Sequence, residues 1–465
     1  MEEINSDSRR PRWPLFSTLI LSVLLAAFTT TGGRQVFVKE VLGSAFDSQA
    51  EHFLHGDVDV DGDAIRHEAI IVNGRARMYF GPFPALLRIP LNFIYPAGLG
   101  YWSRLSGLTA GILALASFAA LVAGALRRSS LSLRSRAWFG SACVVGFALG
   151  SPLLLLLGNL SIYNEAIIWA FAWALAALFF AVRARKATEH RLIASLFGFS
   201  FCAGAALLSR ATFGLPVLLI APLFLLRLPR TRRFSGAAAA LGPVGSALIF
   251  YIFLSYARFG TWSGTRYENY INPVHREFAR EHGMFSLSRI PFGFVDYFTL
   301  RFPHIDSSAP FLQGQRHPVP YPLLYSLPFS ENYLSVLWCS SWLIVGAIIG
   351  LAYLFQRTRS DCFQRWVAAA FFIQFVLILS HFSLAQRYAT ELYSFLIFCF
   401  LIFLARSGPA LNRLRHFIVA LVGASIAINS LTTVSWLIDA DQNVPAETRD
   451  VWKSVLGQSA ASKKD

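Results

Sequence analysis

The sequence predicts an all-α protein that crosses a membrane many times, and three observations lead to this fold class. Hydrophobic residues make up 55% of the 465 residues, and the mean hydropathy is +0.50, which is typical of membrane proteins rather than of soluble domains. Apolar runs of roughly 17–25 residues recur along the chain, the length that a helix needs to cross the hydrocarbon core. Charged residues are 14% of the chain and gather between these runs.

We expect about eleven membrane-spanning helices, one for each long apolar run. Their approximate ranges are 14–31, 105–126, 137–157, 164–182, 191–209, 212–228, 235–257, 333–355, 366–384, 388–405 and 416–437. The segment 83–100 is also apolar, but it contains three prolines and Arg88. Because a span must satisfy its backbone hydrogen bonds internally, we expect this segment to lie on the surface or to re-enter the membrane instead of crossing it.

The basic residues predict the orientation of these helices. Short arginine clusters occupy every second connection, whereas the long loops 32–104 and 258–332 fall on the other side of the membrane. Because positive residues are retained on the cytoplasmic side, we expect a cytoplasmic N-terminus and one transmembrane domain, residues 1–437, followed by an extracytoplasmic tail, residues 438–465. The net charge of +15 follows from these clusters and therefore does not indicate a nucleic-acid partner. Most acidic residues fall on the outer side, so chemistry that needs carboxylates is expected there.

The loop 32–104 contains two recognisable local structures. Residues 47–55 have helical spacing, with Ala50 and Phe53 on one side of the helix. Residues 69–80 form two strand-like runs around an Asn-Gly pair, which favours a type I′ hairpin turn. We therefore expect a short helix followed by a small hairpin.

Between these two structures lies the acidic run DVDVDGDAIRHE, residues 57–68, which has the spacing of a calcium-binding loop. Its candidate ligands for calcium or magnesium are Asp57, Asp59, Asp61, Asp63 and Glu68. In an EF-hand the loop is followed by a helix, whereas the residues after this run are strand-like. Two interpretations stay open: a cation loop without the second helix, and a solvated connector between the expected helix and the hairpin.

The same loop resembles the first outer loop of the GT-C superfamily of polytopic glycosyltransferases, which includes aminoarabinose and protein O-mannosyl transferases. The resemblance rests on FDSQAEHFLHG, residues 46–56, and MYFGPFPALL, residues 78–87. In that superfamily an aspartate at this place is the catalytic base, and the matching residue here is Asp47. The resemblance also implies that Glu51 and Tyr79 bind substrate.

Three further stretches extend the resemblance. They are NLSIYNEAIIWA with Glu165, LLSRATFGLP with Arg210, and AQRYATELY with Arg387 and Tyr388. The resemblance implies that these four residues bind substrate, although the proline that usually follows the last stretch is missing. From the residues alone, Glu165 and Arg210 are equally well explained as a structural ion pair between adjacent spans.

The resemblance implies an enzyme that moves a sugar from a polyprenyl-phosphate donor to an acceptor hydroxyl on the extracytoplasmic face. The leaving phosphate needs cations, which Arg210 and Arg387 would supply, and the attacking hydroxyl needs one base. Displacement in a single step inverts the anomeric carbon. A lipid, a glycan and a protein all stay open as the acceptor, and we expect the chain in a bacterial inner membrane with the site facing the periplasm or exterior.

The alternative is a transporter or flippase for a lipid-linked or small anionic substrate. Many such proteins are built from inverted repeats with charges at the midplane of the membrane. We find no internal repeat in this sequence, and its intramembrane charges gather at one face of the predicted bundle instead of the midplane. The enzyme is therefore the favoured interpretation.

Overall fold

The computed structural model describes most of the chain. The described ranges are 12–31, 34–226, 228, 230–262, 264–315, 329–356, 361–406, 408–439 and 443–458. Helices dominate these ranges, and the strands are short.

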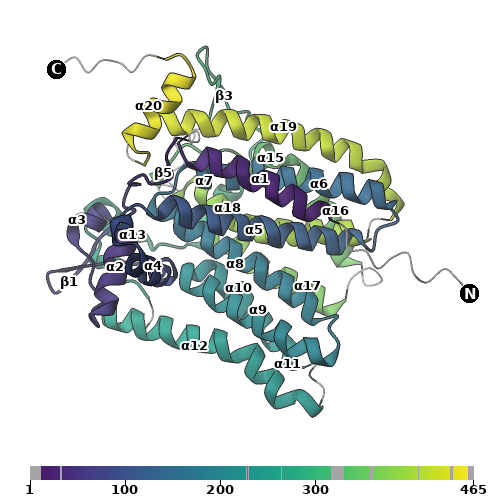
Figure 1. The fold of residues 1–465 in the computed structure, drawn as a ribbon, viewed down its shortest axis with the longest axis horizontal. Coiled ribbons are helices and arrows are strands. Elements are labelled where there is room, and N and C mark those ends of the chain that lie inside the picture. Colours follow the sequence, from purple (N-terminus) through teal and green to yellow (C-terminus); the bar gives the residue numbers. More distant parts are fainter. Residues whose placement is uncertain are drawn as a thin grey trace, which may run out of the picture.

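The longer helices run side by side across the view in Figure 1. They are α1 (Trp13–Thr29), α5 (Ser103–Leu126), α6 (Leu133–Leu149), α8 (Ile162–Ala184), α9 (Glu189–Ser209), α12 (Arg233–Phe259), α16 (Ser341–Phe355), α17 (Cys362–Leu379), α18 (Gln386–Arg406) and α19 (Pro409–Asp439). The shorter helices are α2 (Ala45–Leu54), α3 (Gly62–Ile65), α4 (Phe83–Ile94), α7 (Pro152–Gly158), α10 (Ala211–Ile220), α11 (Pro222–Leu225), α13 (Pro273–His282), α14 (Ile290–Tyr297), α15 (Val336–Cys339) and α20 (Ala446–Val455).

Three strand pairs complete the described elements. The strands are β1 (Ile70–Val72), β2 (Arg75–Arg77), β3 (His304–Ile305), β4 (Leu312–Gln313), β5 (Phe329–Ser330) and β6 (Ser383–Leu384). The pairs β1–β2 and β3–β4 are antiparallel hairpins, and β5–β6 is parallel.

The described residues contain seven helices that are long and apolar enough to cross a membrane. An eighth is counted if α6 and α7, which meet at an angle of 45°, act as one bent span. All eleven predicted ranges overlap helices, but α1, α16 and the α10–α11 pair are shorter than the other candidates. The multi-span helical class is therefore confirmed, whereas the number eleven and the orientation remain predictions.

Burial separates the central helices from the peripheral ones. In α18 and α8 the most apolar windows are 89% and 78% buried, whereas in α12 and α19 they are 28% and 33% buried. Figure 1 shows α12 and α19 at opposite edges of the molecule, with α8 and α18 between them. A helix that is apolar all around and buried belongs to the core of such a bundle, and an exposed apolar helix suits contact with lipid.

The first long loop, residues 34–102 as described, gathers at one end of the bundle with α2, α3, α4 and the β1–β2 hairpin (Figure 1). Both expected local structures are confirmed, the helix as α2 and the hairpin as β1–β2. Asn73 and Gly74 have φ angles of 52° and 77°, as a type I′ turn requires. The proline-containing segment forms α4, a helix of 12 residues, which is too short to cross the hydrocarbon core.

We predict that Gly350→Ala destabilises the bundle, because the backbone of α18 packs directly against this glycine of α16. A Cβ atom at Gly350 would lie 1.8 Å from the carbonyl oxygen of Cys399, so the helices must separate. The expected cost is about 1–3 kcal/mol, seen as a lower unfolding temperature of the purified protein. The control is Gly242→Ala in α12, where a Cβ atom meets nothing within 4 Å. Equal stability of the two variants would contradict the packing described here.

Candidate functional site

A cavity of about 550 Å³ lies where the two long loops meet the ends of the helices. Its walls come from the first loop and the second loop (258–332), the first turns of α8 and α18, the junction of α9 and α10, and single residues of α12 and α17. Clefts of this size, with a few polar groups among aromatic walls, are the usual form of small-ligand sites. Four residues to which the sequence resemblance assigned a substrate-binding role line it together: Tyr79, Arg210, Arg387 and Tyr388.

Two arginines in this cavity stack their guanidinium groups on one aromatic ring, that of Tyr388. Arg210 lies in extended conformation between α9 and α10 and donates from Nε to Glu391, 2.7 Å away. Arg387, in the first turn of α18, donates to Glu331, also 2.7 Å away. The guanidinium carbons lie 5.2 and 5.1 Å from the centroid of the Tyr388 ring. Ion pairs and stacking thus fix both cations at one wall of the cavity.

A buried carboxylate, Glu68, lines the cavity as well. It is 6% exposed and accepts hydrogen bonds from the hydroxyls of Tyr79, at 2.6 Å, and Tyr163, at 2.5 Å. Burial and the Glu68 charge raise the pKa of Tyr79 well above its ordinary value, so this phenol keeps its proton and remains a donor. Tyr267 and Tyr270 extend the aromatic wall beside Tyr79, with ring centroids 4.8 Å apart.

Two histidines that sequence reasoning missed also line the cavity. Burial, and to a smaller extent the charge of Arg210, lower the pKa of His381 to about 3, against a hydrogen bond with Ser383 that raises it. Burial also lowers the pKa of His275, against the charge of Glu68. Both imidazoles are therefore neutral at pH 7, and the arginines remain the cations of this cavity.

Asp47 lies outside this cavity, in the buried seam between α2, α4 and α8. Asp47 is 2% exposed, and its Oδ2 accepts the backbone N–H of Gly100 at 3.2 Å. Arg88 of α4 reaches Oδ1 at 3.7 Å and donates to Glu165 of α8 at 2.5 Å. One buried guanidinium thus bridges two buried carboxylates and ties the first loop to the bundle.

The expected ion pair between Glu165 and Arg210 is wrong. Glu165 pairs with Arg88, and Arg210 pairs with Glu391, which lies 181 residues further along the chain. Neither Glu165 nor Asp47 is among the residues that line the cavity. The sequence suggested a pair between neighbouring spans. It did not reveal that α4 supplies the partner of Glu165 and that α18 supplies the partner of Arg210.

The five carboxylates of the acidic run do not converge on one point. Asp59 accepts from Arg75 and Arg77 at 3.0 and 2.9 Å, and Asp61 accepts from Ser48 at 2.6 Å. Asp57 faces His52, Asp63 is exposed, and Glu68 faces the cavity. Among the described residues, no group of three or more His, Cys, Asp or Glu side chains is placed to hold a metal ion. The connector interpretation therefore fits this arrangement better than a cation loop.

Glu51, which the resemblance assigns to substrate, is exposed on α2 and does not line the cavity. Glu68 was expected only as a metal ligand. The signal that could have placed Glu68 at the site is the recurrence of tyrosines in several segments. Tyrosine hydroxyls can donate the hydrogen bonds that a buried carboxylate needs. Which tyrosines meet it depends on packing between the two loops.

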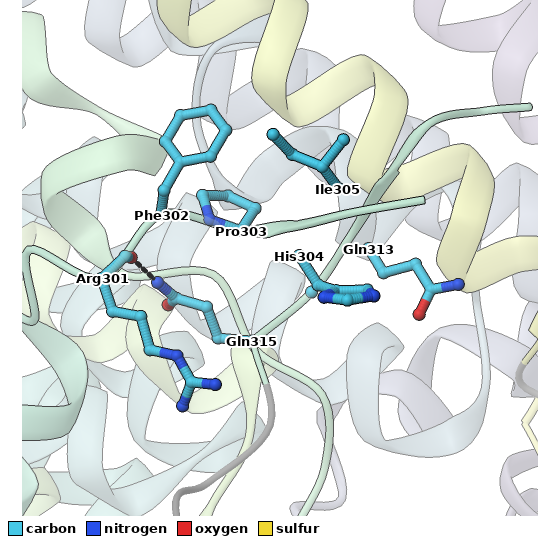
Figure 2. A pocket seen from close by; sticks show the side chains of 8 residues that line it. Arg301, Phe302, Pro303, His304, Ile305, Gln313 and Gln315 are labelled. Atoms are coloured by element: carbon cyan, nitrogen blue, oxygen red, sulfur yellow. Dashed lines mark hydrogen bonds between the residues drawn. The ribbon is translucent and has the colours of Figure 1, made fainter. Parts of the chain in front are cut away.

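Figure 2 shows another cavity, of about 570 Å³, within residues 301–315 of the second loop. The side-chain amide of Gln315 donates to the carbonyl of Arg301 across it. Its eight described lining residues include one arginine, one histidine and no carboxylate. Because charges of both signs converge in the cavity of Arg210, Arg387 and Glu68, that cavity is the better candidate site.

Comparisons with known proteins gave structural similarities alone. No protein-family model and no curated protein matches the chain. ArnT from Cupriavidus metallidurans bound to undecaprenyl phosphate is 12% identical over 96% of this chain and 78% of that chain, with a TM-score of 0.43. The same enzyme in the apo state is 15% identical over 95% of this chain and 84% of that chain, with a TM-score of 0.34.

The archaeal oligosaccharyltransferase AglB from Archaeoglobus fulgidus, in complex with an inhibitory peptide and a dolichol-phosphate, is 13% identical. The match covers 96% of this chain and 56% of that chain, with a TM-score of 0.48. The chain is thus similar in structure to ArnT and AglB. With TM-scores of 0.34 to 0.48, this similarity carries no argument about substrate or mechanism.

We predict a pH dependence of stability that originates at Asp47. Burial raises its pKa from 3.8 to about 6, against the opposing charge of Arg88. Between these two values the folded state keeps a proton that the unfolded state has lost, so stability falls as the pH rises through this window. Asp47→Asn should flatten the unfolding temperature between about pH 4 and pH 6. Glu51→Gln, an exposed carboxyl of the same helix, is the control, and an unchanged slope in Asp47→Asn would contradict the assignment.

Proposed function

We propose that this chain is a membrane glycosyltransferase that moves a sugar from a polyprenyl-phosphate donor to an acceptor hydroxyl. The observation that carries the proposal is one cavity in which two fixed arginines face a buried carboxylate. The cavity lies at the ends of the bundle helices, where a prenyl tail between helices would present its phosphate. The sugar would then lie among the aromatic side chains of the two loops.

The arginines suit the phosphate of the donor. Each guanidinium carries five N–H donors, and the pairs with Glu391 and Glu331 occupy only part of them. Nε of Arg387 has no hydrogen-bond partner within the described structure. As the bond between the anomeric carbon and the phosphate oxygen breaks, the phosphate leaves with the electron pair and gains charge. Fixed cations stabilise that charge without a proton transfer.

The carboxylate suits the acceptor. When the acceptor oxygen attacks the anomeric carbon, its proton must pass to a base, and one carboxylate is sufficient. We propose Glu68 for this role because it lines the cavity and its tyrosine bonds fix its orientation. Asp47 is the alternative base that the sequence resemblance implies. It would reach the cavity only if α2 moved, since it is buried against Arg88.

The tyrosines of the loops suit the sugar. Tyr79 packs edge to face against Tyr267 and Tyr270, with centroids 6.3 Å apart in both pairs. Aromatic rings offer flat apolar faces with a polar rim, and such faces can stack on the C–H side of a sugar ring. Single displacement at the anomeric carbon in this cavity would invert its configuration.

The two candidate bases make opposite predictions. If Glu68 is the base, Glu68→Gln lowers transfer by about 10²- to 10⁴-fold, whereas Asp47→Asn keeps most of the activity. The measurement is release of polyprenyl phosphate from a panel of polyprenyl-phosphate hexoses and pentoses with labelled sugar, by purified protein. If Asp47→Asn loses transfer activity and Glu68→Gln keeps it, Asp47 is the base. Movement of the donor across liposomes without bond breakage would contradict the enzyme and support a transporter.

The arginines are tested by binding rather than by turnover. A charge-assisted hydrogen bond contributes about 1.5–3 kcal/mol, so Arg210→Gln and Arg387→Gln should each weaken polyprenyl-phosphate binding by roughly 10-fold or more. Arg266→Gln, an exposed arginine of the second loop, is the matched control. Binding of polyprenyl phosphate by calorimetry should separate these variants. Equal affinity in all three would exclude the arginines as the phosphate site.

A further inference from the structure

A second charged cavity, of about 660 Å³, lies at the opposite end of the bundle from the proposed site. Four helices line the first cavity with one end and this cavity with the other, namely α8, α9, α17 and α18. On α8, Tyr163 lines the first and Val182 lines the second. At a rise of about 1.5 Å per residue, this spacing corresponds to roughly 30 Å, the thickness of the hydrocarbon core. The two cavities thus open at opposite faces of the membrane.

Six cationic side chains line this second cavity. They are Arg127, Arg128, Arg183, Arg185, Lys186 and Arg191. In the described part of the chain, Arg185 is the member that has a carboxylate partner, Asp361. Burial and the neighbouring charges of Arg128, Arg185 and Arg127 lower the pKa of Lys186. The cations therefore repel one another, and an anion between them would relieve that repulsion.

Apart from Thr188 and Gln364, the remaining wall of the cavity is apolar. Phe179 and Val182 of α8 and Leu401 of α18 contribute to it. Arginines at one face of a membrane protein are what topology alone requires, but topology does not require that they surround a cavity with an apolar wall. A ligand that satisfies both parts carries a phosphate and hydrocarbon chains. Free phosphate would leave the apolar wall uncovered.

We propose that this cavity binds the headgroup of an anionic phospholipid from the leaflet at that face. The phosphate lies among the six cations, and the acyl chains begin against the apolar wall of the cavity. Basic pockets between membrane helices bind such headgroups elsewhere. The proposal is independent of the transfer reaction, because the two cavities share no lining residue.

The test uses the full chain in a neutral detergent and measures bound lipid by native mass spectrometry. The probes are phosphatidylglycerol, phosphatidylcholine of the same chain length, and inorganic phosphate. The variant is Arg127→Gln with Arg128→Gln and Lys186→Gln. The control is Arg232→Gln with Arg233→Gln, because these exposed arginines lie where α12 begins, at the same face but outside the cavity.

We expect phosphatidylglycerol to bind about 10-fold or more tightly than phosphatidylcholine. We expect the cavity variant to lose that preference and the control to keep it. If the variant and the control lose the preference for phosphatidylglycerol equally, the proposal is overturned. The arginines would then act only through the general positive charge of that face. Displacement of phosphatidylglycerol by equimolar inorganic phosphate would overturn the lipid assignment. If the triple variant does not fold, the lipid preference of Arg128→Gln is compared with that of the unaltered protein. A weaker preference for phosphatidylglycerol in Arg128→Gln supports the proposal, and an unchanged preference overturns it.

Discussion

Charged groups at the edge of an apolar bundle must be paired, and this constraint organises the structure. Arg88 bridges Asp47 and Glu165, Arg104 pairs with Glu40 at 2.6 Å, and Arg210 pairs with Glu391. Each pair joins segments that are far apart in the sequence. An unpaired ion at such depth is costly, so the pairs hold the first loop against the helix ends. The cavity exists because the loop is held there.

The pairing also separates two kinds of carboxylate. Asp47 is fully enclosed, and its cation is shared with a second acid, which suits a structural joint between α2, α4 and α8. Glu68 accepts hydrogen bonds from two tyrosine hydroxyls, has His67 at 3.9 Å, and faces the cavity. The sequence resemblance to GT-C glycosyltransferases implies Asp47 as the catalytic base. The geometry of the cavity favours Glu68 for the same role. The two roles need not conflict, because a joint that places α2 also places the segment that carries Glu68.

Hydropathy and turn chemistry predicted the helices and the β1–β2 hairpin, because both depend on local sequence. The resemblance to GT-C glycosyltransferases selected Tyr79, Arg210, Arg387 and Tyr388, which the structure brings into one cavity. Reasoning from the sequence failed for contacts between distant segments. The partner of Arg210 lies in α18, and Asp59 of the acidic run pairs with Arg75 and Arg77 from the hairpin beside it. No local pattern encodes such contacts, since they depend on how helices and loops pack.

The central claim is that Arg210 and Arg387 hold the phosphate of a polyprenyl-phosphate substrate in the cavity at the loop end of the bundle. The most direct measurement is a cryo-electron microscopy structure of the full chain with polyprenyl phosphate. The account predicts phosphate oxygens about 2.8 Å from guanidinium nitrogens of both arginines, with the prenyl chain leaving between the bundle helices. A phosphate bound beside Asp47, or held only by the cations at the opposite face, would contradict it.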